Sequence, residues 1–323
     1  MNPNNLLYLV VPCYNEQEVL PETHRRLSKK LEQLAQTGAI ASNSKMLFVD
    51  DGSRDSTWQI IAGLAQADPH VAGVKLSRNR GHQNALLAGL TVAAKNSDIT
   101  ISVDADLQDD LDAIDQMVEK YHNGAQIVDG VRSDRTTDSF FKRTTAQGFY
   151  KLMEAMGVET VYNHADYRLM SRRALEELLS FKEVNLFLRG MVPQLGFKTD
   201  TVTYKRAQRF AGQSKYPLKK MLALAINGIT SFSVKPLQLV FWLGLLCGFG
   251  GLCATLCQVV LAVLGKAPST AAFVLSSLWL VCGILLTALG VVGEYVGKIY
   301  LETKARPRFV IEQVVGQPAD DRN

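Results

Sequence analysis

The stretch that decides the fold is residues 99–108, with the sequence ITISVDADLQ. Its first half is a short apolar run rich in β-branched side chains, which is typical of a strand buried on both faces. Its second half places two carboxylates and an amide directly after that strand. Open α/β sheets bind ligands at the carboxyl ends of their strands. The stretch therefore predicts a parallel strand that ends at a polar binding edge.

The chain around this stretch alternates apolar runs with helical stretches. The runs are Leu6–Val11, Lys45–Val49, Val71–Leu76, Ile99–Val103 and Gln126–Val131. The stretches between them, with apolar residues three and four positions apart, are Glu18–Ala35, Ser56–Ala67, Gln83–Ala94 and Leu111–His122. Strict alternation of strand and helix predicts an α/β fold with a mostly parallel, Rossmann-like sheet. The part that follows is less regular: we expect a helix at Phe140–Met156, a strand at Tyr167–Met170 leading into a helix from Arg172, and a strand at Thr201–Tyr204.

The polar side chains after the fourth run fall on alternate positions, Asp104, Asp106 and Gln108. In an extended segment these side chains share one face. Two close carboxylates repel each other unless a cation lies between them. Hard oxygen ligands in an open arrangement suit Mg²⁺ or Mn²⁺ shared with a diphosphate. A competing interpretation, that the acids cap the next helix, fits Asp109 and Asp110 better than Asp104.

Two earlier strand ends carry residue types that contact nucleotides. Pro12, Tyr14 and Glu16 follow the first run, and Asp50, Asp51 and Ser53 follow the second. The acids and the serine can hydrogen-bond a ribose or a base. Ordinary turn chemistry explains Asp-Gly-Ser equally well, and Tyr14 could simply pack. Three strand ends with such residues at one sheet edge nevertheless favour a nucleotide site.

The C-terminal part contains two windows without Asp, Glu, Lys or Arg, between Lys235 and Lys266 and between Lys266 and Glu294. About 20 apolar residues cross a hydrocarbon core of roughly 30 Å, so we predict two membrane spans within 234–298 rather than two buried core helices. Basic residues flank the pair on both outer sides, which predicts that both termini are cytoplasmic. Small residues in the first window, such as Gly244 and Gly248, permit close helix packing and favour a homo-oligomer.

These windows divide the chain into four predicted parts: a cytosolic domain at 1–214, an amphipathic juxtamembrane helix at 215–233, the spans at 234–298 and a cytosolic tail at 299–323. Within the tail, Arg308–Val315 is predicted to be a strand that pairs with a neighbouring subunit, or else a mobile segment. We expect no cleaved signal peptide, because no basic region precedes an apolar stretch at the N-terminus.

The composition excludes several classes of protein. The chain has 323 residues, of which 47% are hydrophobic and 20% charged, so it is neither a disordered tail nor a disulfide-stabilised miniprotein. Its five cysteines show no C-x-x-C pair, so neither structural zinc nor disulfides are expected.

Six short motifs precede the two apolar windows. They are Val11–Glu16, Val49–Ser53, Arg78–His82, Asp104–Gln108, Asp166–Met170 and Arg209–Tyr216. In this order, and together with the windows, they resemble the polyprenyl-phosphate glycosyltransferases of the GT-A fold. That family includes dolichol-phosphate mannose synthases, bactoprenol glucosyl transferases of the GtrB type and the undecaprenyl-phosphate aminoarabinose transferase. The resemblance covers nearly the whole chain and is strongest for the bactoprenol glucosyl branch.

The resemblance implies a reaction in which a sugar moves from a nucleotide diphosphate to the phosphate of a membrane polyprenol, with inversion at the anomeric carbon. The expected donor is UDP-glucose and the expected acceptor undecaprenyl phosphate, at the cytoplasmic face of the inner membrane. GDP-mannose or an amino-sugar donor is the alternative, and a non-catalytic nucleotide-binding adaptor is a further one. The implied partners are the donor, the lipid and the bilayer, with no nucleic acid.

The resemblance also implies roles for individual residues. The metal, Mg²⁺ or Mn²⁺, would be held by Asp106 and Gln108, with Asp104 close to the ribose and the water shell of the metal. The nucleoside would be held by the residues at the first two strand ends, Pro12, Tyr14, Glu16, Asp50 and Asp51. Asp166 would contact a sugar hydroxyl or act as a weak base, unless it caps a helix.

The acceptor phosphate is expected to meet basic and polar residues just before the juxtamembrane helix. They are Arg206, Arg209, Ser214 and Lys215. Arginine can grip a phosphate through two parallel hydrogen bonds. Plain attraction to an anionic membrane is the competing explanation for basic residues in this region. The catalytic residues are accordingly predicted to be Asp104, Asp106, Asp166 and Arg209.

Overall fold

The computed structural model describes residues 5–133, 164–183, 188–205 and 270–316, together with isolated positions between 240 and 264. The chain forms two compact units. The first consists of Met1–Tyr150, Glu159–Pro217 and Arg306–Asn323, and the second of Lys151–Val158 and Leu218–Ala305. All described residues of the candidate site belong to the first unit.

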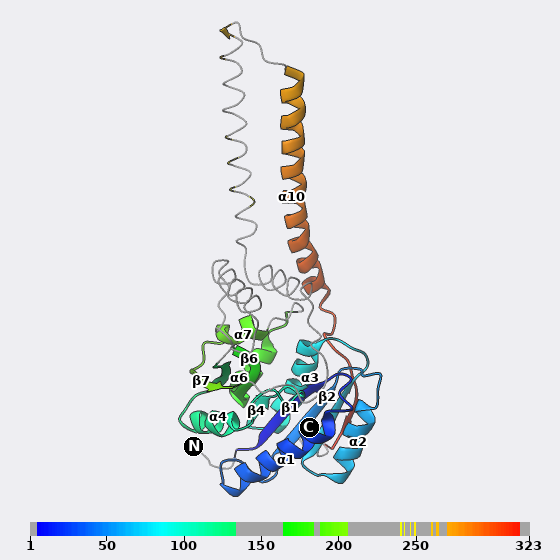
Figure 1. The fold of residues 1–323 in the computed structure, drawn as a ribbon, viewed down its shortest axis with the longest axis vertical. Coiled ribbons are helices and arrows are strands. Elements are labelled where there is room, and N and C mark those ends of the chain that lie inside the picture. The colour runs from blue at the N-terminus through cyan, green and yellow to red at the C-terminus, as the bar shows by residue number, and fades with distance from the viewer. Residues whose placement is uncertain are drawn as a thin grey trace. The chain divides into compact units, whose positions relative to one another are not determined.

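The first unit is built on a sheet whose strand order is β7-β5-β6-β4-β1-β2-β3-β8 (Figure 1). The strands are β1 (Leu7–Cys13), β2 (Lys45–Asp50), β3 (Val71–Leu76), β4 (Ile99–Ser102), β5 (Ile127–Arg132), β6 (His164–Ser171), β7 (Thr199–Tyr204) and β8 (Ile311–Val315). β1 pairs in parallel with β2 and β4, β2 with β3, and β5 with β7. Among the described strands, only β6 and β8 run antiparallel to their neighbours. The predicted α/β fold with a mostly parallel sheet is confirmed.

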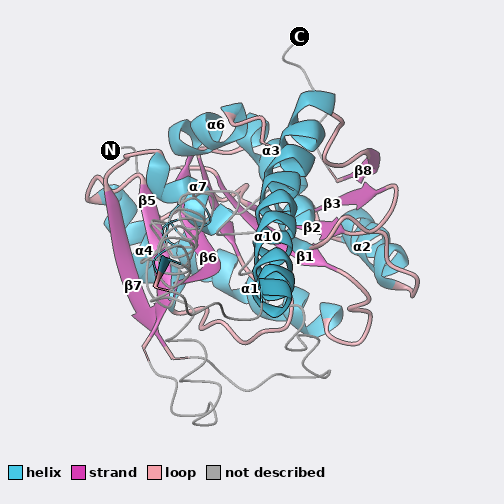
Figure 2. Cartoon of the chain, turned by 90° about the horizontal axis from the view of Figure 1, so that it is seen from above, coloured by secondary structure: helices cyan, strands magenta, loops and turns pink. Residues whose placement is uncertain are grey.

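Helices cover both faces of the sheet (Figure 2). In the first unit they are α1 (Leu20–Gln36), α2 (Thr57–Ala67), α3 (His82–Asn96), α4 (Ala113–His122), α6 (Arg172–Ser180) and α7 (Leu188–Gln194). The apolar sides of α1, α2 and α4 share one core with alternate residues of β1, including Leu7 and Leu9. α3 packs against the other face, where a Cβ on Gly89 would lie 2.4 Å from Cγ1 of Val10. Glycine is therefore required for this close approach of helix and sheet.

The predicted elements of the first 132 residues all form, with shifts of a few residues at their ends. The strands at Tyr167–Met170 and Thr201–Tyr204 and the helix from Arg172 also form, as β6, β7 and α6. Helix α7 was not predicted, because its sequence contains Gly190 and Pro193, which both disfavour helix interiors. The helix predicted at Phe140–Met156 lies outside the described residues.

The strand predicted near the C-terminus forms as β8 and pairs with a strand of its own chain. It pairs antiparallel with β3 of the same chain, for example Val314 with Val74. The main-chain N–H of Ser77 donates to the carbonyl oxygen of Val310 at 3.0 Å. The expectation of a mobile segment is therefore wrong for Ile311–Val315. The physical reason is that β8 satisfies the hydrogen-bonding edge that β3 would otherwise leave open. Pairing with a neighbouring subunit stays a prediction, because β8 is the last strand in the order of the sheet.

The described part of the second unit is dominated by α10 (Thr270–Lys304), which overlaps the second predicted span. Large apolar side chains along it, such as Leu278, Leu285 and Leu289, are exposed. Among the described residues, no helix combines the length and apolarity needed to cross a membrane. The juxtamembrane helix predicted at 215–233, Gly244, Gly248 and most of the first predicted span lie outside the described residues.

Candidate active site

The loops that follow β1 and β2 are tied together at the carboxyl edge of the sheet. The main-chain N–H of Asn15 donates to Oγ of Ser53 at 2.9 Å, and the N–H of Arg54 donates to Oδ1 of Asn15 at 2.9 Å. The N–H of Glu16 donates to Oγ1 of Thr57 at 2.9 Å. The predicted convergence of the first two strand ends is therefore confirmed, and these two loops form one hydrogen-bonded rim.

Asp51 holds the loop after β3 in place. Its Oδ1 accepts a hydrogen bond from the main-chain N–H of Arg80 at 2.7 Å, and its Oδ2 accepts one from Gly81 at 2.9 Å. The neighbouring Gly52 has a φ of +65°, and a Cβ there would lie 2.6 Å from the carbonyl carbon of Arg78. Asp51 was predicted to contact the nucleotide. In the structure its carboxylate fixes the loop that leads into α3, whose first residue is His82.

An open pocket of about 340 Å³ lies at this rim, and Tyr14 and Ser53 line it together with residues of β3 and β8. Asp50, the last residue of β2, is fully buried. Oδ1 of Asp50 accepts from the N–H of Ser53 at 3.1 Å, whereas Oδ2 has no partner among the described residues. Burial raises the pKa of Asp50. Pro12 lies within β1, opposite Val49 of β2.

The acidic segment after β4 is a turn rather than the extended chain that we predicted. β4 ends at Ser102, and Leu107 has a φ of +56°. The main-chain N–H of Gln108 donates to Oδ1 of Asp106 at 3.2 Å, and only 8% of Gln108 is exposed. The argument that alternate residues share a face is therefore wrong here, because it requires an extended chain and these residues form a turn with a left-handed residue. A turn, and not a strand, determines how Asp104 and Asp106 are placed.

Asp109 is a member of this acidic cluster and not a helix cap. Helix α4 is preceded by Asp112, whose N–H donates to Oδ1 of Asp110 at 3.0 Å. Asp109 is buried, and its Oδ1 accepts a hydrogen bond from the hydroxyl of Tyr204 at 2.6 Å. Burial, and then the charges of Asp104 and Asp106, raise the pKa of Asp109 to about 6, although Tyr204 and Arg132 act against this rise.

Removing the hydroxyl that supports Asp109 is expected to destabilise the protein. Oδ2 of Asp109 already has no partner among the described residues, so Tyr204→Phe would leave neither carboxyl oxygen with a hydrogen-bond donor among them. An unsatisfied buried acceptor costs about 1–3 kcal/mol. Thermal unfolding of the purified full-length variants measures this loss. Tyr121→Phe on α4 is the matched control, and an equal loss in both variants would contradict the prediction.

Asp166 is held between two cations. It lies inside β6, and Ser171 caps the following helix, so the helix-capping interpretation of Asp166 is wrong. The guanidinium of Arg189 on α7 donates to both carboxyl oxygens, with Nε 3.1 Å from Oδ1 and Nη2 3.3 Å from Oδ2. Nε2 of His82 lies 3.6 Å from Oδ2 of Asp166 and 3.6 Å from Oδ1 of Asp104. His82 therefore bridges the acidic turn and β6.

The charges in this cluster support one another. Burial opposes ionisation of Asp166, but Arg189 and His82 outweigh it and hold the pKa of this carboxyl well below its usual value. Burial likewise disfavours the imidazolium of His82, and the carboxylates of Asp166 and Asp104 overcome it and raise its pKa to about 9. A carboxylate with so low a pKa accepts hydrogen bonds well but is a poor general base at neutral pH.

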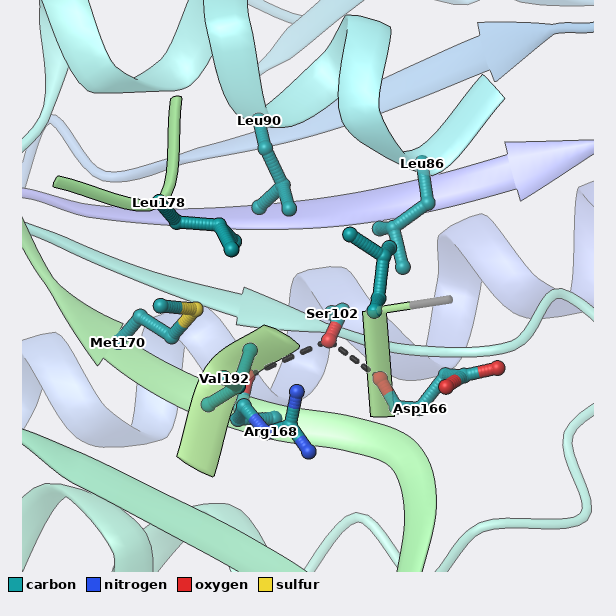
Figure 3. Close-up of a pocket in the computed structure, with 9 residues that line it drawn as sticks. Leu86, Leu90, Ser102, Asp166, Arg168, Met170, Leu178 and Val192 are labelled. Carbon is teal, nitrogen blue, oxygen red and sulfur yellow. Dashed lines mark hydrogen bonds between the residues drawn. The ribbon is translucent and has the colours of Figure 1, made fainter. Parts of the chain in front are cut away.

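The backbone beneath Asp166 is fixed by Ser102. Its hydroxyl donates to the main-chain oxygens of Asp166 and Arg168, as Figure 3 shows. Leu90, Leu178 and Met170 line the apolar side of a small cavity next to Ser102, and the Asp166 carboxylate points away from them. The cavity between these side chains has a volume of about 10 Å³, which suits a single water molecule and no substrate.

The described residues fit an open cation site rather than a closed one. No group of three or more His, Cys, Asp or Glu side chains among them is arranged to hold a metal. Mg²⁺, however, is commonly bound by one or two carboxylates together with substrate phosphates. Asp104 and Asp106 supply such oxygens, and their negative charges add to the larger effect of burial in raising the pKa of Asp109. A cation shared with a diphosphate would relieve this crowding.

Several residues of the site were not predicted from the sequence. His82 ends one of the quoted motifs but received no role, and Asp109 was interpreted as a helix cap. Arg189 and Tyr204 carried no signal of a role in the site. Their contacts join distant segments, such as Asp109 with Tyr204. The predicted acceptor residues Arg206, Arg209, Ser214 and Lys215 lie outside the described residues.

A mostly parallel sheet with a nucleotide-sized pocket and an acidic turn at its carboxyl edge is the architecture of a GT-A sugar-transferring enzyme. The chain belongs to glycosyl transferase family 2, which matches residues 8–179. It is 50% identical over 307 residues to the uncharacterized glycosyltransferase YkoT of Bacillus subtilis (strain 168), covering 95% of this chain and 91% of that one.

Two further comparisons extend along most of the chain. The bactoprenol glucosyl transferase of Shigella phage SfX is 39% identical over 306 residues, covering 94% of this chain and 98% of that one. Among solved structures, the mannosyltransferase PcManGT from Pyrobaculum calidifontis in complex with GDP-Man and Mn²⁺ has a TM-score of 0.46 and 17% identity, covering 94% of this chain and 87% of that one. The protein is a glycosyltransferase.

Proposed function

We propose that the protein transfers glucose from UDP-glucose to undecaprenyl phosphate, with inversion at the anomeric carbon. The observation that carries this proposal is the 39% identity to a bactoprenol glucosyl transferase over 94% of the chain. The family match itself ends at residue 179. Similarity to the bactoprenol enzyme therefore extends far into the part of the chain that would meet a lipid acceptor.

The donor would bind at the rim formed by the loops after β1 and β2. Tyr14 would pack against the nucleoside. The nucleoside would donate a hydrogen bond to the buried Oδ2 of Asp50, and this bond would offset the cost of an unpaired buried acceptor. Pro12 and Glu16 complete this part of the proposed site. Asp51 would act indirectly, since its two oxygens hold the loop at Arg80 and Gly81.

Asp106 and Gln108 would hold Mg²⁺ or Mn²⁺ against the donor diphosphate, with Asp104 beside them. Bound there, the ion supplies charge neutralisation for the departing nucleoside diphosphate. Asp166, kept ionised by Arg189 and His82, would accept hydrogen bonds from the sugar hydroxyls. Its low pKa fits this role better than that of a base.

The acceptor needs little activation. A phosphate monoester has a second pKa near 6, so its oxygen is largely ionised at pH 7. The predicted acceptor residues Arg206, Arg209, Ser214 and Lys215 would orient it. Alignment and leaving-group stabilisation then account for most of the proposed catalysis.

We also propose that the protein is an integral protein of the cytoplasmic membrane with two spans and both termini in the cytoplasm. Two supports are the charge-free windows between Lys235 and Glu294, which are interrupted only by Lys266, and the exposed apolar side chains of α10. An extended exposed apolar surface is typical of a membrane or protein contact.

Mass spectrometry of lipid products tests the proposed reaction. Purified full-length protein would be incubated with UDP-glucose, GDP-mannose or a UDP-amino sugar, with a short polyprenyl phosphate and with Mg²⁺ or Mn²⁺. We expect a polyprenyl-phosphate hexose from UDP-glucose. A product from GDP-mannose alone would reassign the sugar, and no lipid product from any donor would overturn the proposal.

A further inference from the structure

The strand that follows α10 contributes to the nucleotide pocket. In the pairing of β3 with β8, Lys75 is opposite Gln313 and Leu76 is opposite Ile311, so Glu312 has no opposite residue. This is a β-bulge, a feature that redirects a side chain and is common next to active sites. Glu312 lines the pocket of about 340 Å³ together with Tyr14 and Ser53. The bulge thus places an acid from the C-terminal end of the chain at the predicted nucleoside site.

Glu312 binds a lysine that lies beside Asp50. Its Oε1 is 3.1 Å from Nζ of Lys75, which also lines the pocket. Lys75 is in turn paired in register with Asp50 on the neighbouring strand β2. Burial raises the pKa of Asp50. Hydrogen bonds from Ser53, and after them the charge of Lys75, act against this rise, which is consistent with the register that places Lys75 beside Asp50. Lys75 consequently has two carboxylates within its electrostatic reach.

The two carboxylates differ in what they already bind. Oδ2 of Asp50 is buried and has no hydrogen-bond partner among the described residues. Glu312 is exposed and engages Lys75 directly. If Glu312 were neutral, Lys75 would be drawn towards Asp50, the remaining anion beside it. The acceptor predicted for the nucleoside would then be occupied by an internal cation.

We propose that Glu312 is a positioning residue for the donor nucleotide: it holds Lys75 away from Asp50 and so keeps the Asp50 carboxylate available to the nucleoside. The inference rests on the proposed nucleotide-sugar function. It extends the donor site beyond the family match at residues 8–179 to a strand at the other end of the chain. The class of ligand that we expect this arrangement to bind is a nucleoside diphosphate.

Calorimetric titration of the full-length protein with UDP and Mg²⁺ tests the proposal. Glu312→Gln removes the charge but keeps the shape, and we expect the dissociation constant for UDP to rise about two- to fivefold, as for an exposed ion pair. The donor KM should rise equally, with kcat and the lipid KM unchanged. Glu312→Asp should recover part of the loss. Gln313→Ala, at the neighbouring exposed position, is the matched control and should bind UDP like the wild type.

A second substitution separates positioning from a structural role. In Lys75→Met/Glu312→Gln no cation remains to occupy Asp50, so this double variant should bind UDP more tightly than Glu312→Gln alone. An unchanged UDP affinity in Glu312→Gln, or a double variant no better than the single one, would overturn the inference. The inference would also be overturned if Glu312→Gln lowered kcat and the melting temperature and raised the KM values of both donor and lipid. Wild-type protein that makes no lipid product but shows the predicted UDP pattern would instead count against the proposed acceptor alone.

Discussion

Asp106→Asn is expected to lower the rate of sugar transfer by about 10²–10³-fold, the loss typical when a group that stabilises transition-state charge is removed. The substitution keeps the size of the side chain and its place in the turn, where Oδ1 accepts from the N–H of Gln108. It removes one negative charge from the proposed cation site. The metal would then bind more weakly, and charge on the departing diphosphate would be less well neutralised.

The matched control for this change is Asp110→Asn in the same loop. Asp110 is exposed, and its Oδ1 accepts from the N–H of Asp112. Asp110→Asn therefore removes an equal charge outside the proposed site. We expect it to retain near wild-type transfer. Electron paramagnetic resonance of Mn²⁺ in the presence of UDP measures metal binding independently of activity. Wild-type transfer and Mn²⁺ affinity in Asp106→Asn would contradict the metal assignment.

The parallel part of the fold was predictable because it depends on local patterns. Each of the first strands is a short apolar run, and each intervening helix repeats its apolar residues at helical spacing. Neither the strand order nor the insertion of β6 between β4 and β5 follows from those patterns. Pairing partners are set by contacts between distant residues, which also explains why β8 was recognised as a strand while its pairing with β3 was not predicted.

The candidate site was predictable at the level of strand ends and not of individual contacts. The rule that ligands bind at the carboxyl edge predicted that the loops after the first two strands lie together, as the hydrogen bond between Asn15 and Ser53 shows. It could not reveal that Leu107 adopts a left-handed conformation and turns the acidic segment. Nor could it distinguish Asp109 from Asp110, since only the tertiary fold brings Tyr204 to one of these adjacent acids.

Arg189 illustrates the same limit from the side of function. Arg189 lies on α7, a helix that the sequence pattern did not predict because it contains Pro193. Its guanidinium nevertheless donates two hydrogen bonds to the Asp166 carboxylate. The order of the motifs identified the family without this residue. Sequence motifs thus recorded the acids of the site better than the cations that hold them.

Arg189→Met is expected to lower kcat/KM for UDP-glucose by about 10- to 100-fold. Breaking a buried ion pair costs about 3–5 kcal/mol, and the effect here is smaller because the Arg189 side chain is 31% exposed. Arg189 and His82 both counteract the effect of burial on the pKa of Asp166. Without the guanidinium one of these two cations is lost, so the pKa of Asp166 rises towards its ordinary value. Its oxygens would also lose their orientation towards the sugar hydroxyls.

The dependence on pH and on the sugar distinguishes this loss from simple unfolding. Wild-type Asp166 stays ionised far below neutral pH, so its ionisation does not limit wild-type activity near pH 5. In Arg189→Met the raised pKa makes activity fall further as pH decreases towards the ordinary carboxyl range. Because Asp166 is assigned to the sugar, affinity for UDP alone should be unchanged while affinity for UDP-glucose decreases. Arg172→Met, which removes the ion pair with Asp98, is the control and should alter neither. An equal weakening of UDP and UDP-glucose binding would contradict the assignment of this cluster to the sugar.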